Sequence, residues 1–257
     1  MGRVYLVGAG PGDPELLTVK AVRLLARAQI VFHDSLVSAE VLRLIARGAE
    51  VIDVGKRCGR KLLTQEEINA LLVSAGEKHE VVIRLKGGDP LIFGRAGEEI
   101  EALRYAGVDF EIVPGITAVL GAAAAAGISL TDRRAASQLV IGTFSRGPQS
   151  SAMDWGAITS TTTLVLYMPG ADYAEVAHRL REGGLPGDLP CVIVSHASGP
   201  QQQIRRTTVA ELAREEKLPA PALMIVGRVA SQKVQEISKA FWNGDAKEHQ
   251  APRPAVS

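Results

Sequence analysis

Charged residues gather just beyond the apolar runs in the first half of this chain, where they could act together on a ligand. Asp34, Lys56 and Asp89 each stand shortly after a different run. In open α/β sheets, ligands bind beyond the carboxyl ends of the strands. A carboxylate in such a cleft can stabilise positive charge or accept a proton, and a cation can bind an acidic substrate. The sequence therefore predicts one cleft that collects these side chains, together with Arg57 and Arg95.

A glycine-rich loop, Gly8–Pro14, separates the first apolar run from the helical segment that follows it. Alternate glycines admit backbone conformations closed to other residues, and Pro11 stiffens the turn. A dinucleotide fingerprint needs glycine at its sixth position, but Asp13 stands there, and no Gly-Lys-Ser/Thr follows a glycine loop in this chain. The loop therefore indicates a ligand that it does not hold by phosphate groups. A tight turn without a ligand is the alternative.

The elements that must position these residues alternate in the manner of α/β proteins. The predicted strands are Val4–Val7, Ile30–Phe32, Glu50–Val54, Val81–Leu85, Phe110–Val113, Leu139–Ile141, Thr163–Tyr167, Cys191–Val194 and Ala222–Val226. The predicted helices cover residues 15–28, 38–46, 65–78, 94–106, 116–126, 172–182 and 228–240. Thr64 and Glu67 have the spacing of a capping box at the start of the helix over 65–78. The polar stretches 145–151 and 196–208 are predicted to be loops or edge hairpins.

The connection Val113–Ile116 separates two series of strands and helices, which predicts two α/β domains. The N-terminal domain is predicted to span residues 1–114 and the C-terminal domain residues 115–242. Residues 243–257 contain prolines and almost no apolar side chains, so we expect a disordered tail there.

Composition excludes several classes of function. The chain of 257 residues has a net charge of +1, 4% aromatic residues and no basic block, which argues against nucleic-acid binding. Cys58, Cys191 and the five histidines show no ligand spacing, so we expect no metal. The sequence shows neither a leader nor an unbroken apolar span of membrane length. We therefore expect a cytoplasmic protein that does not bind a membrane.

Structural interpretations compete with functional ones at several positions. The basic run that contains Lys56 is commonly a solvated face, and residues 87–90 are all turn formers, although Lys86, directly after a buried strand, favours a ligand at this edge. Met168 is the kind of residue that usually packs in a core, and His33 alone is commonly a structural histidine. Asp34 is therefore the better candidate for chemistry at the end of its strand.

Several segments of the chain resemble the tetrapyrrole methylase family. They are the loop Gly8–Thr18, the segment Arg84–Arg95, the junction Val113–Ala118 and the run Pro221–Gly227. The first three together are highly specific, and the similarity extends over about residues 3–242. The segments His33–Val37 and Val54–Arg57 resemble the members that methylate uroporphyrinogen III more than those acting on later corrin intermediates.

The resemblance implies a homodimer of two-domain α/β chains with the active site in the cleft between the domains. It implies S-adenosylmethionine as cofactor and S-adenosylhomocysteine as its product. Uroporphyrinogen III would be methylated at C2 and C7 to give precorrin-2 through precorrin-1, on the routes to sirohaem and cobalamin. The cofactor residues would be Pro11, Gly87, Gly88, Asp89, Ile92, Thr117, Ala118, Met168 and Ala197, with Ala222 a weaker candidate. The residues facing the substrate would be Asp34, Lys56, Arg95, Glu98 and Arg133.

These residue types suit the implied chemistry. Methyl transfer from a sulfonium to carbon depends mainly on alignment of donor and acceptor. A carboxylate such as Asp34 or Glu98 would stabilise the cationic pyrrole before a proton is lost. Arginine and lysine side chains would bind the carboxylates of the substrate.

Departures from the family pattern cluster on the expected substrate side. Asp132 and Lys61 stand where histidines are common, and Thr143–Ser145 replaces a typical Thr-Gly-His. Two alternatives therefore stay open. One is a sister methylase that acts on a later corrinoid precursor, and the other is a non-catalytic tetrapyrrole-binding protein.

Overall fold

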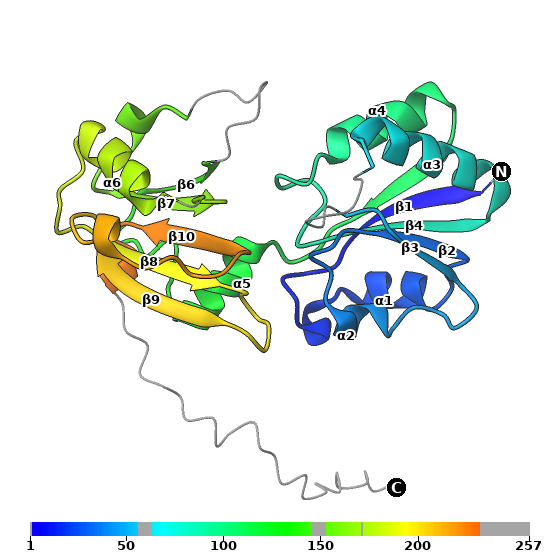
Figure 1. Ribbon diagram of the computed structural model, residues 1–257, viewed down its shortest axis with the longest axis horizontal. Coiled ribbons are helices and arrows are strands. Elements are labelled where there is room, and N and C mark those ends of the chain that lie inside the picture. Colours follow the sequence, from blue (N-terminus) through cyan, green and yellow to red (C-terminus); the bar gives the residue numbers. More distant parts are fainter. Residues whose placement is uncertain (1, 56–62, 145–152, 171, 232–257) are drawn as a thin grey trace, which may run out of the picture.

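The computed structural model describes residues 2–55, 63–144, 153–170 and 172–231. Two five-stranded sheets lie side by side, joined by the connection between β5 and α5 (Figure 1). The strands are β1 (Arg3–Gly8), β2 (Ile30–His33), β3 (Glu50–Asp53), β4 (Val81–Lys86), β5 (Asp109–Val113), β6 (Gln138–Thr143), β7 (Thr162–Tyr167), β8 (Pro190–Ser195), β9 (Gln203–Thr208) and β10 (Ala222–Val226). The α-helices are α1 (Val19–Leu25), α2 (Ala39–Leu42), α3 (Gln65–Lys78), α4 (Ala96–Tyr105), α5 (Ala118–Ala126) and α6 (Tyr173–Glu182).

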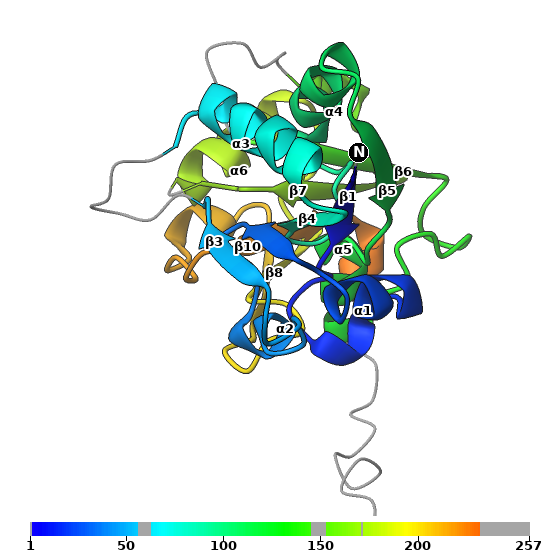
Figure 2. The same ribbon diagram turned by 90° about the vertical axis from the view of Figure 1, so that its right-hand side faces the viewer.

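The first sheet has the strand order β3-β2-β4-β1-β5, and all of its pairings are parallel. Helices α3 and α4 cover one face of it, and α1 and α2 cover the other (Figure 2). Leu72 of α3 and Leu103 of α4 pack with Leu6 on one face, while Leu25 of α1 packs with Val7 on the other. Helical cover on both faces explains why the central strands read as continuous apolar runs.

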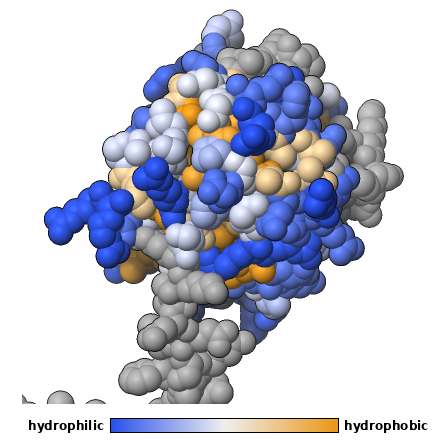
Figure 3. All heavy atoms as spheres, turned by 90° about the vertical axis from the view of Figure 1, so that its left-hand side faces the viewer, coloured by the Kyte–Doolittle hydropathy of each residue, from blue (hydrophilic) through white to orange (hydrophobic). Residues whose placement is uncertain are grey.

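The second sheet has the order β6-β7-β10-β8-β9 and is mixed. β6 and β7 are parallel, whereas β10 is antiparallel to both β7 and β8, and β9 is antiparallel to β8. Helix α6 packs on one face and α5 on the other. The predicted stretch 196–208 thus contains an edge strand. Figure 3 shows the end of the molecule formed by this half, where hydrophilic residues surround smaller apolar areas.

Local sequence signals explain several helix boundaries. The capping box is confirmed, because the Glu67 N–H donates to Thr64 Oγ1 at 3.2 Å and the Thr64 N–H donates to Glu67 Oε2 at 2.7 Å. The helix predicted over 15–28 is instead a 3-10 turn, Pro14–Leu16, followed by α1. Thr18 starts the new helix by accepting the Ala21 N–H at 3.2 Å. Side chains that cap the helix N-termini therefore decide where these helices begin.

Other predicted elements are shorter than the sequence indicated. The helix predicted over 94–106 begins at Ala96, because Arg95 has a left-handed backbone with φ 56°. The helix predicted over 38–46 is reduced to α2, and within the described part of 228–240 only a 3-10 helix, Arg228–Ser231, is formed. The predictions for Lys56, Arg57, Cys58, Lys61, residues 145–151 and the tail 243–257 lie outside the described residues.

The described residues contain neither a cluster of metal ligands nor a membrane-spanning helix. No group of three or more His, Cys, Asp or Glu side chains among them could hold a metal ion. No helix in the described ranges is both long and apolar enough to cross a membrane. Cys191 is a free, buried thiol in the second sheet, and burial raises its pKa to about 12.

Candidate active site

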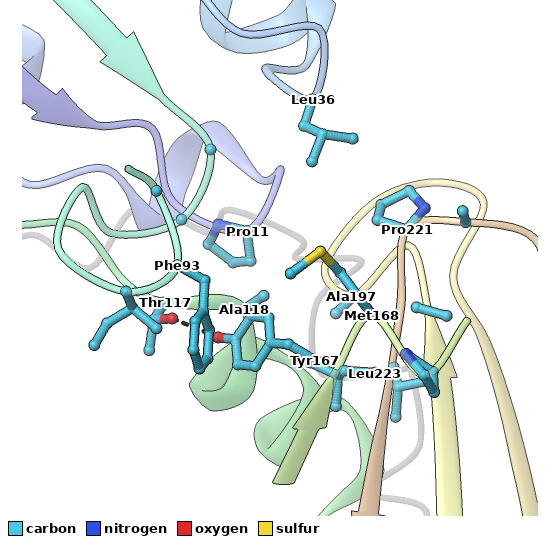
Figure 4. A pocket seen from close by; sticks show the side chains of 18 of the residues that line it. Pro11, Leu36, Phe93, Thr117, Ala118, Tyr167, Met168, Ala197, Pro221 and Leu223 are labelled. Atoms are coloured by element: carbon cyan, nitrogen blue, oxygen red, sulfur yellow. Dashed lines mark hydrogen bonds between the residues drawn. The ribbon is translucent and has the colours of Figure 1, made fainter. Parts of the chain in front are cut away.

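A cavity of about 590 Å³ lies where the carboxyl ends of the first sheet's strands meet the second sheet (Figure 4). Pro11 reaches it from the loop after β1, and Gly88 from the loop after β4. Met168 and Ala197 reach it from the ends of β7 and β8. All nine residues predicted to hold a cofactor line this cavity, namely Pro11, Gly87, Gly88, Asp89, Ile92, Thr117, Ala118, Met168 and Ala197. Ala222, the weaker candidate, lines it too.

The loops after β1, β4 and β5 contact one another through glycine backbones. Gly10 and Gly88 exchange two hydrogen bonds, with N···O distances of 3.1 Å and 2.8 Å, and both have left-handed backbones. A Cβ on Gly8 would lie 2.6 Å from the Cα of Gly115 and 2.7 Å from the carbonyl oxygen of Gly88. No side chain fits at Gly8, where the three loops meet. The glycine-rich loop predicted from the sequence therefore forms a wall of the cavity by close backbone packing.

Asp89 fastens two of these loops with its carboxylate. Oδ1 accepts the Leu91 N–H at 2.8 Å, and Oδ2 accepts the Gly115 N–H at 3.0 Å. The segment 87–90 is thus a turn, as its composition suggested, and it also lines the cavity. The two interpretations of that segment are compatible.

Tyr167, at the end of β7 in the second sheet, contacts the N-terminus of α5. Its hydroxyl lies 2.5 Å from Thr117 Oγ1 (Figure 4) and accepts the Val119 N–H at 3.0 Å. Thr117 is the N-cap residue of α5 but makes no side-chain cap, so the tyrosine hydroxyl satisfies an open N–H of that helix. The ring of Phe93 packs on the Tyr167 ring with centroids 5.1 Å apart. Phe93 and Tyr167 both line the cavity.

Unusual backbone conformations concentrate around the cavity. Phe93 and Met168, which line it, have positive φ values of 52° and 48°, and His196 and Ser198 flank Ala197 with φ values of 47° and 63°. Non-glycine residues in this region cost about 1–3 kcal/mol each and cluster at functional sites. The side chain of Met168 is 46% exposed, so it is not the core residue that its apolar neighbours would suggest.

Asp34 is the cavity-lining member of a cluster of buried charges. Its Oδ1 accepts a short hydrogen bond from Nη2 of Arg84. Arg84 Nε donates to Glu99 Oε1 at 2.8 Å, and Lys86 Nζ lies 3.0 Å from both Glu99 oxygens. Burial acts to lower the pKa of Arg84, but the carboxylates of Asp34 and Glu99 outweigh it and raise that pKa. Burial, followed by repulsion from Arg84, lowers the pKa of Lys86.

The remaining predicted substrate residues do not line this cavity among the described residues. Arg95 and Glu98 form a bidentate ion pair with each other, with both N···O distances 2.7 Å, and their side chains are about half exposed. Arg133 is exposed on the loop between α5 and β6. Lys56 lies outside the described residues. Of the described members of that set, Asp34 alone is brought together with the predicted cofactor residues.

Comparison with known proteins identifies the family of this chain. The family model for Tetrapyrrole (Corrin/Porphyrin) Methylases matches residues 3–213. The chain belongs to the tetrapyrrole methylase family. It is 49% identical over 236 residues to a uroporphyrinogen-III C-methyltransferase of Paracoccus denitrificans. The matched region covers 90% of this chain and 82% of that protein.

Two further similarities concern a longer relative and a solved structure. This methylase is 43% identical to a siroheme synthase of Actinobacillus pleuropneumoniae over 89% of its length, but it spans only about half, 48%, of that protein. It also resembles the crystal structure of uroporphyrin-III C-methyl transferase from Thermus thermophilus complexed with S-adenosyl homocysteine. The TM-score is 0.78 at 39% identity, covering 89% of this chain and 98% of that one.

Several residues of the cavity and of the charged cluster carry no local sequence signal for their role. Nothing in the spacing of Phe93 and Tyr167 indicates that their two rings meet. Lys217 lines the cavity from the loop before β10. Glu98 was the predicted substrate residue of α4, but the i, i+3 and i+4 apolar pattern of that helix places its neighbour Glu99 on the inner face. Lys86, predicted to follow β4 at the ligand edge, is instead the last residue of that strand and points to Glu99.

Proposed function

We propose that this chain is an S-adenosylmethionine-dependent uroporphyrinogen-III C-methyltransferase, which methylates C2 and C7 to give precorrin-2 through precorrin-1. The observation that carries the proposal is the single cavity that gathers the glycine loops after β1, β4 and β5 with the Asp34 carboxylate. The similarity to the Paracoccus denitrificans enzyme supports the choice of substrate.

The cavity suits S-adenosylmethionine in size and charge. Its volume of about 590 Å³ lies within the range of sites for cofactor-sized molecules. Its lining in the described residues is mainly apolar, with two carboxylates, Asp34 and Asp89, and one cation, Lys217. That balance favours a ligand carrying positive charge over a phosphate. Pro11, Thr117, Ala118, Met168 and the other predicted cofactor residues would hold it.

When bound, S-adenosylmethionine supplies a sulfonium methyl group, whose bond to sulfur breaks with the electron pair left on sulfur as a pyrrole carbon forms the new bond. Asp34 faces the cavity as a carboxylate paired with Arg84. In that position it stabilises the positive charge that the pyrrole acquires, and accepts the one proton lost from the tetrapyrrole for each methyl gained. The close-packed glycine loops and the rings of Phe93 and Tyr167 restrict the orientations that the methyl donor and the pyrrole acceptor can adopt.

The acidic side chains of the substrate require cations near the cavity. Lys217 lies on its lining and is exposed, so it is available to a substrate carboxylate. We assign the same role to Lys56, Arg95 and Arg133, and Glu98 keeps the Arg95 fork oriented through their ion pair. Guanidinium groups bind carboxylates through two parallel hydrogen bonds, which favours arginine for this task.

We also propose that the protein works as a cytoplasmic homodimer. The proposal rests on the resemblance to the family. Light scattering on the purified protein should give twice the chain mass of 27.3 kDa. A mass of one chain in active protein would contradict it.

Anaerobic incubation with S-adenosylmethionine and uroporphyrinogen III, followed by mass spectrometry of the oxidised product, tests the proposed function. We expect a gain of two methyl groups and formation of S-adenosylhomocysteine. Omission of S-adenosylmethionine is the matched control. Binding of the porphyrinogen without consumption of the methyl donor would favour a carrier protein, and methylation of only a later corrinoid precursor would favour a sister methylase.

A further inference from the structure

Four ionisable side chains form a continuous cluster beside the cavity, and three of them are closed to solvent. The side chains of Lys86, Glu99 and Arg84 are 2%, 0% and 3% exposed, whereas Asp34 is 30% exposed and lines the cavity. Buried ion pairs of this kind contribute little net stability, and well-packed apolar residues often replace them without loss. Their presence at the base of a ligand cavity therefore suggests a role other than stability.

The contacts run in one direction, from the core to the cavity. Lys86 bridges both oxygens of Glu99, and Glu99 Oε1 accepts the Nε–H of Arg84. Arg84 turns its far end, Nη2, to Asp34. Its Nη1 donates to the carbonyl oxygens of Phe32 and Leu85 at 3.4 Å and 3.3 Å. The guanidinium is thus held by three acceptors other than Asp34, which leaves Nη2 to donate to the Asp34 carboxylate.

The backbone alone does not set the direction of the Asp34 carboxylate. The Asp34 N–H donates to the Leu85 carbonyl at 3.1 Å, and its carbonyl oxygen lies 3.0 Å from His33 Nδ1, which fixes the main chain at the end of β2. The described structure gives the Asp34 side chain one ion pair, the one with Arg84. The orientation of that carboxylate therefore depends on where Arg84 is held.

We propose that Glu99, with Lys86 as its counter-ion, is a positioning residue that holds the Arg84 guanidinium and through it orients the Asp34 carboxylate toward the substrate. The inference rests on the proposed function, in which Asp34 touches the tetrapyrrole. Glu99 also balances charge, because without it two buried cations would share the single carboxylate of Asp34. Its neighbour Glu98 lies on the exposed face of α4 and makes no contact with the cluster.

The test is a double-mutant cycle with a charge-balanced pair of substitutions. Lys86→Met with Glu99→Leu removes one buried cation and one buried anion together, so no uncompensated charge is left in the core. We expect this variant to fold, and its kcat for uroporphyrinogen III methylation to fall by about tenfold or more, because small displacements of a reacting group are costly. In the Asp34→Asn background the same pair should cost less than about twofold, since the group that it positions is already disabled.

A conservative variant and a matched control separate positioning from stability. Lys86→Met with Glu99→Gln keeps an acceptor for Arg84 Nε, so we expect it to recover part of the lost kcat. Glu101→Gln changes an exposed carboxylate on the same helix and should leave kcat unchanged. If the apolar pair fails to fold, Glu99→Gln alone enters the same cycle.

The outcomes separate this inference from the proposed function. An equal fold-loss in the wild-type background and in the Asp34→Asn background would overturn the positioning role, as would full activity of the apolar pair. Full activity of Asp34→Asn in an enzyme whose wild type methylates uroporphyrinogen III would overturn this inference alone. No methylation by the wild type would overturn the proposed function and the inference with it.

Discussion

Replacement of Gly115 by alanine should open the wall of the cavity. An added Cβ would lie 2.3 Å from the Gly88 carbonyl oxygen and 2.8 Å from the Cα of Gly8. Ordinary contacts between such atoms are about 3.5–4.0 Å, so the loops must separate by about 1 Å. Both neighbours are backbone atoms, and no side-chain rotation can relieve the clash. The move would also strain the hydrogen bond from the Gly115 N–H to Asp89, now 3.0 Å long.

The size of the effect follows from the packing. Overpacking of a well-packed interior costs about 1–3 kcal/mol. For a chain of this size we expect the melting temperature to fall by roughly 2–12 °C, at about 2–4 °C for each kcal/mol. If about half of that strain is present in the ligand-bound state only, the dissociation constant for S-adenosylmethionine rises by about twofold to twelvefold. Differential scanning fluorimetry and isothermal titration calorimetry measure the two quantities.

Gly97 supplies the matched control. It lies in α4, and an added Cβ there meets no heavy atom within 4 Å. Gly97→Ala should raise stability by about 0.5–1 kcal/mol, because alanine loses less backbone entropy in a helix, and leave binding unchanged. Gly115→Ala with wild-type melting temperature and wild-type affinity would refute the close packing of the three glycine loops.

Three further predictions follow from other parts of the structure. Tyr167→Phe leaves the Val119 N–H without its partner, so the free energy of unfolding should fall by about 1–3 kcal/mol in denaturant titrations, and an unchanged value would contradict the capping role. Lys217→Gln should raise the KM for uroporphyrinogen III severalfold, while calorimetry shows an unchanged affinity for S-adenosylmethionine. An equal loss of affinity for the substrate and for S-adenosylmethionine would argue against a contact between Lys217 and the substrate carboxylates. Because burial raises the pKa of Cys191 to about 12, its thiol stays protonated at pH 8, and a Cys58→Ser variant should react with a thiol reagent only on unfolding. Rapid labelling of that folded variant would disprove the burial.

The cavity-lining residues were predictable because they lie in local motifs. Gly8–Pro14 and Lys86–Pro90 are turns whose backbone conformations depend on their own glycines and prolines, and strand ends are visible as the limits of apolar runs. In a parallel sheet the carboxyl ends of the strands meet at one edge, so Pro11, Gly88 and Thr117 converge once the strands are recognised. The glycine-lined part of the cavity could therefore be predicted from short segments of the sequence.

The charged residues were less predictable, because a charge can be solvated, paired or buried without any change in its local pattern. Arg95 and Glu98 stand in a matching motif, yet in the described structure they pair with each other outside the cavity. Lys86 was expected at the ligand edge, yet its ammonium turns inward to Glu99. For Lys86 the partner lies thirteen positions along the chain, on the inner face of α4, where the local sequence around Lys86 gives no sign of it.

The sequence by itself determined the α/β alternation, the two series of strands, the glycine loops and the family. These properties depend on periodicity and on turn chemistry, which act over a few residues. Only the tertiary structure decided that β10 enters the second sheet antiparallel between β7 and β8, and that Tyr167 caps α5. It alone joined Lys86, Glu99 and Arg84 to Asp34. These contacts join segments far apart in the chain, and their energies depend on burial that no local pattern records.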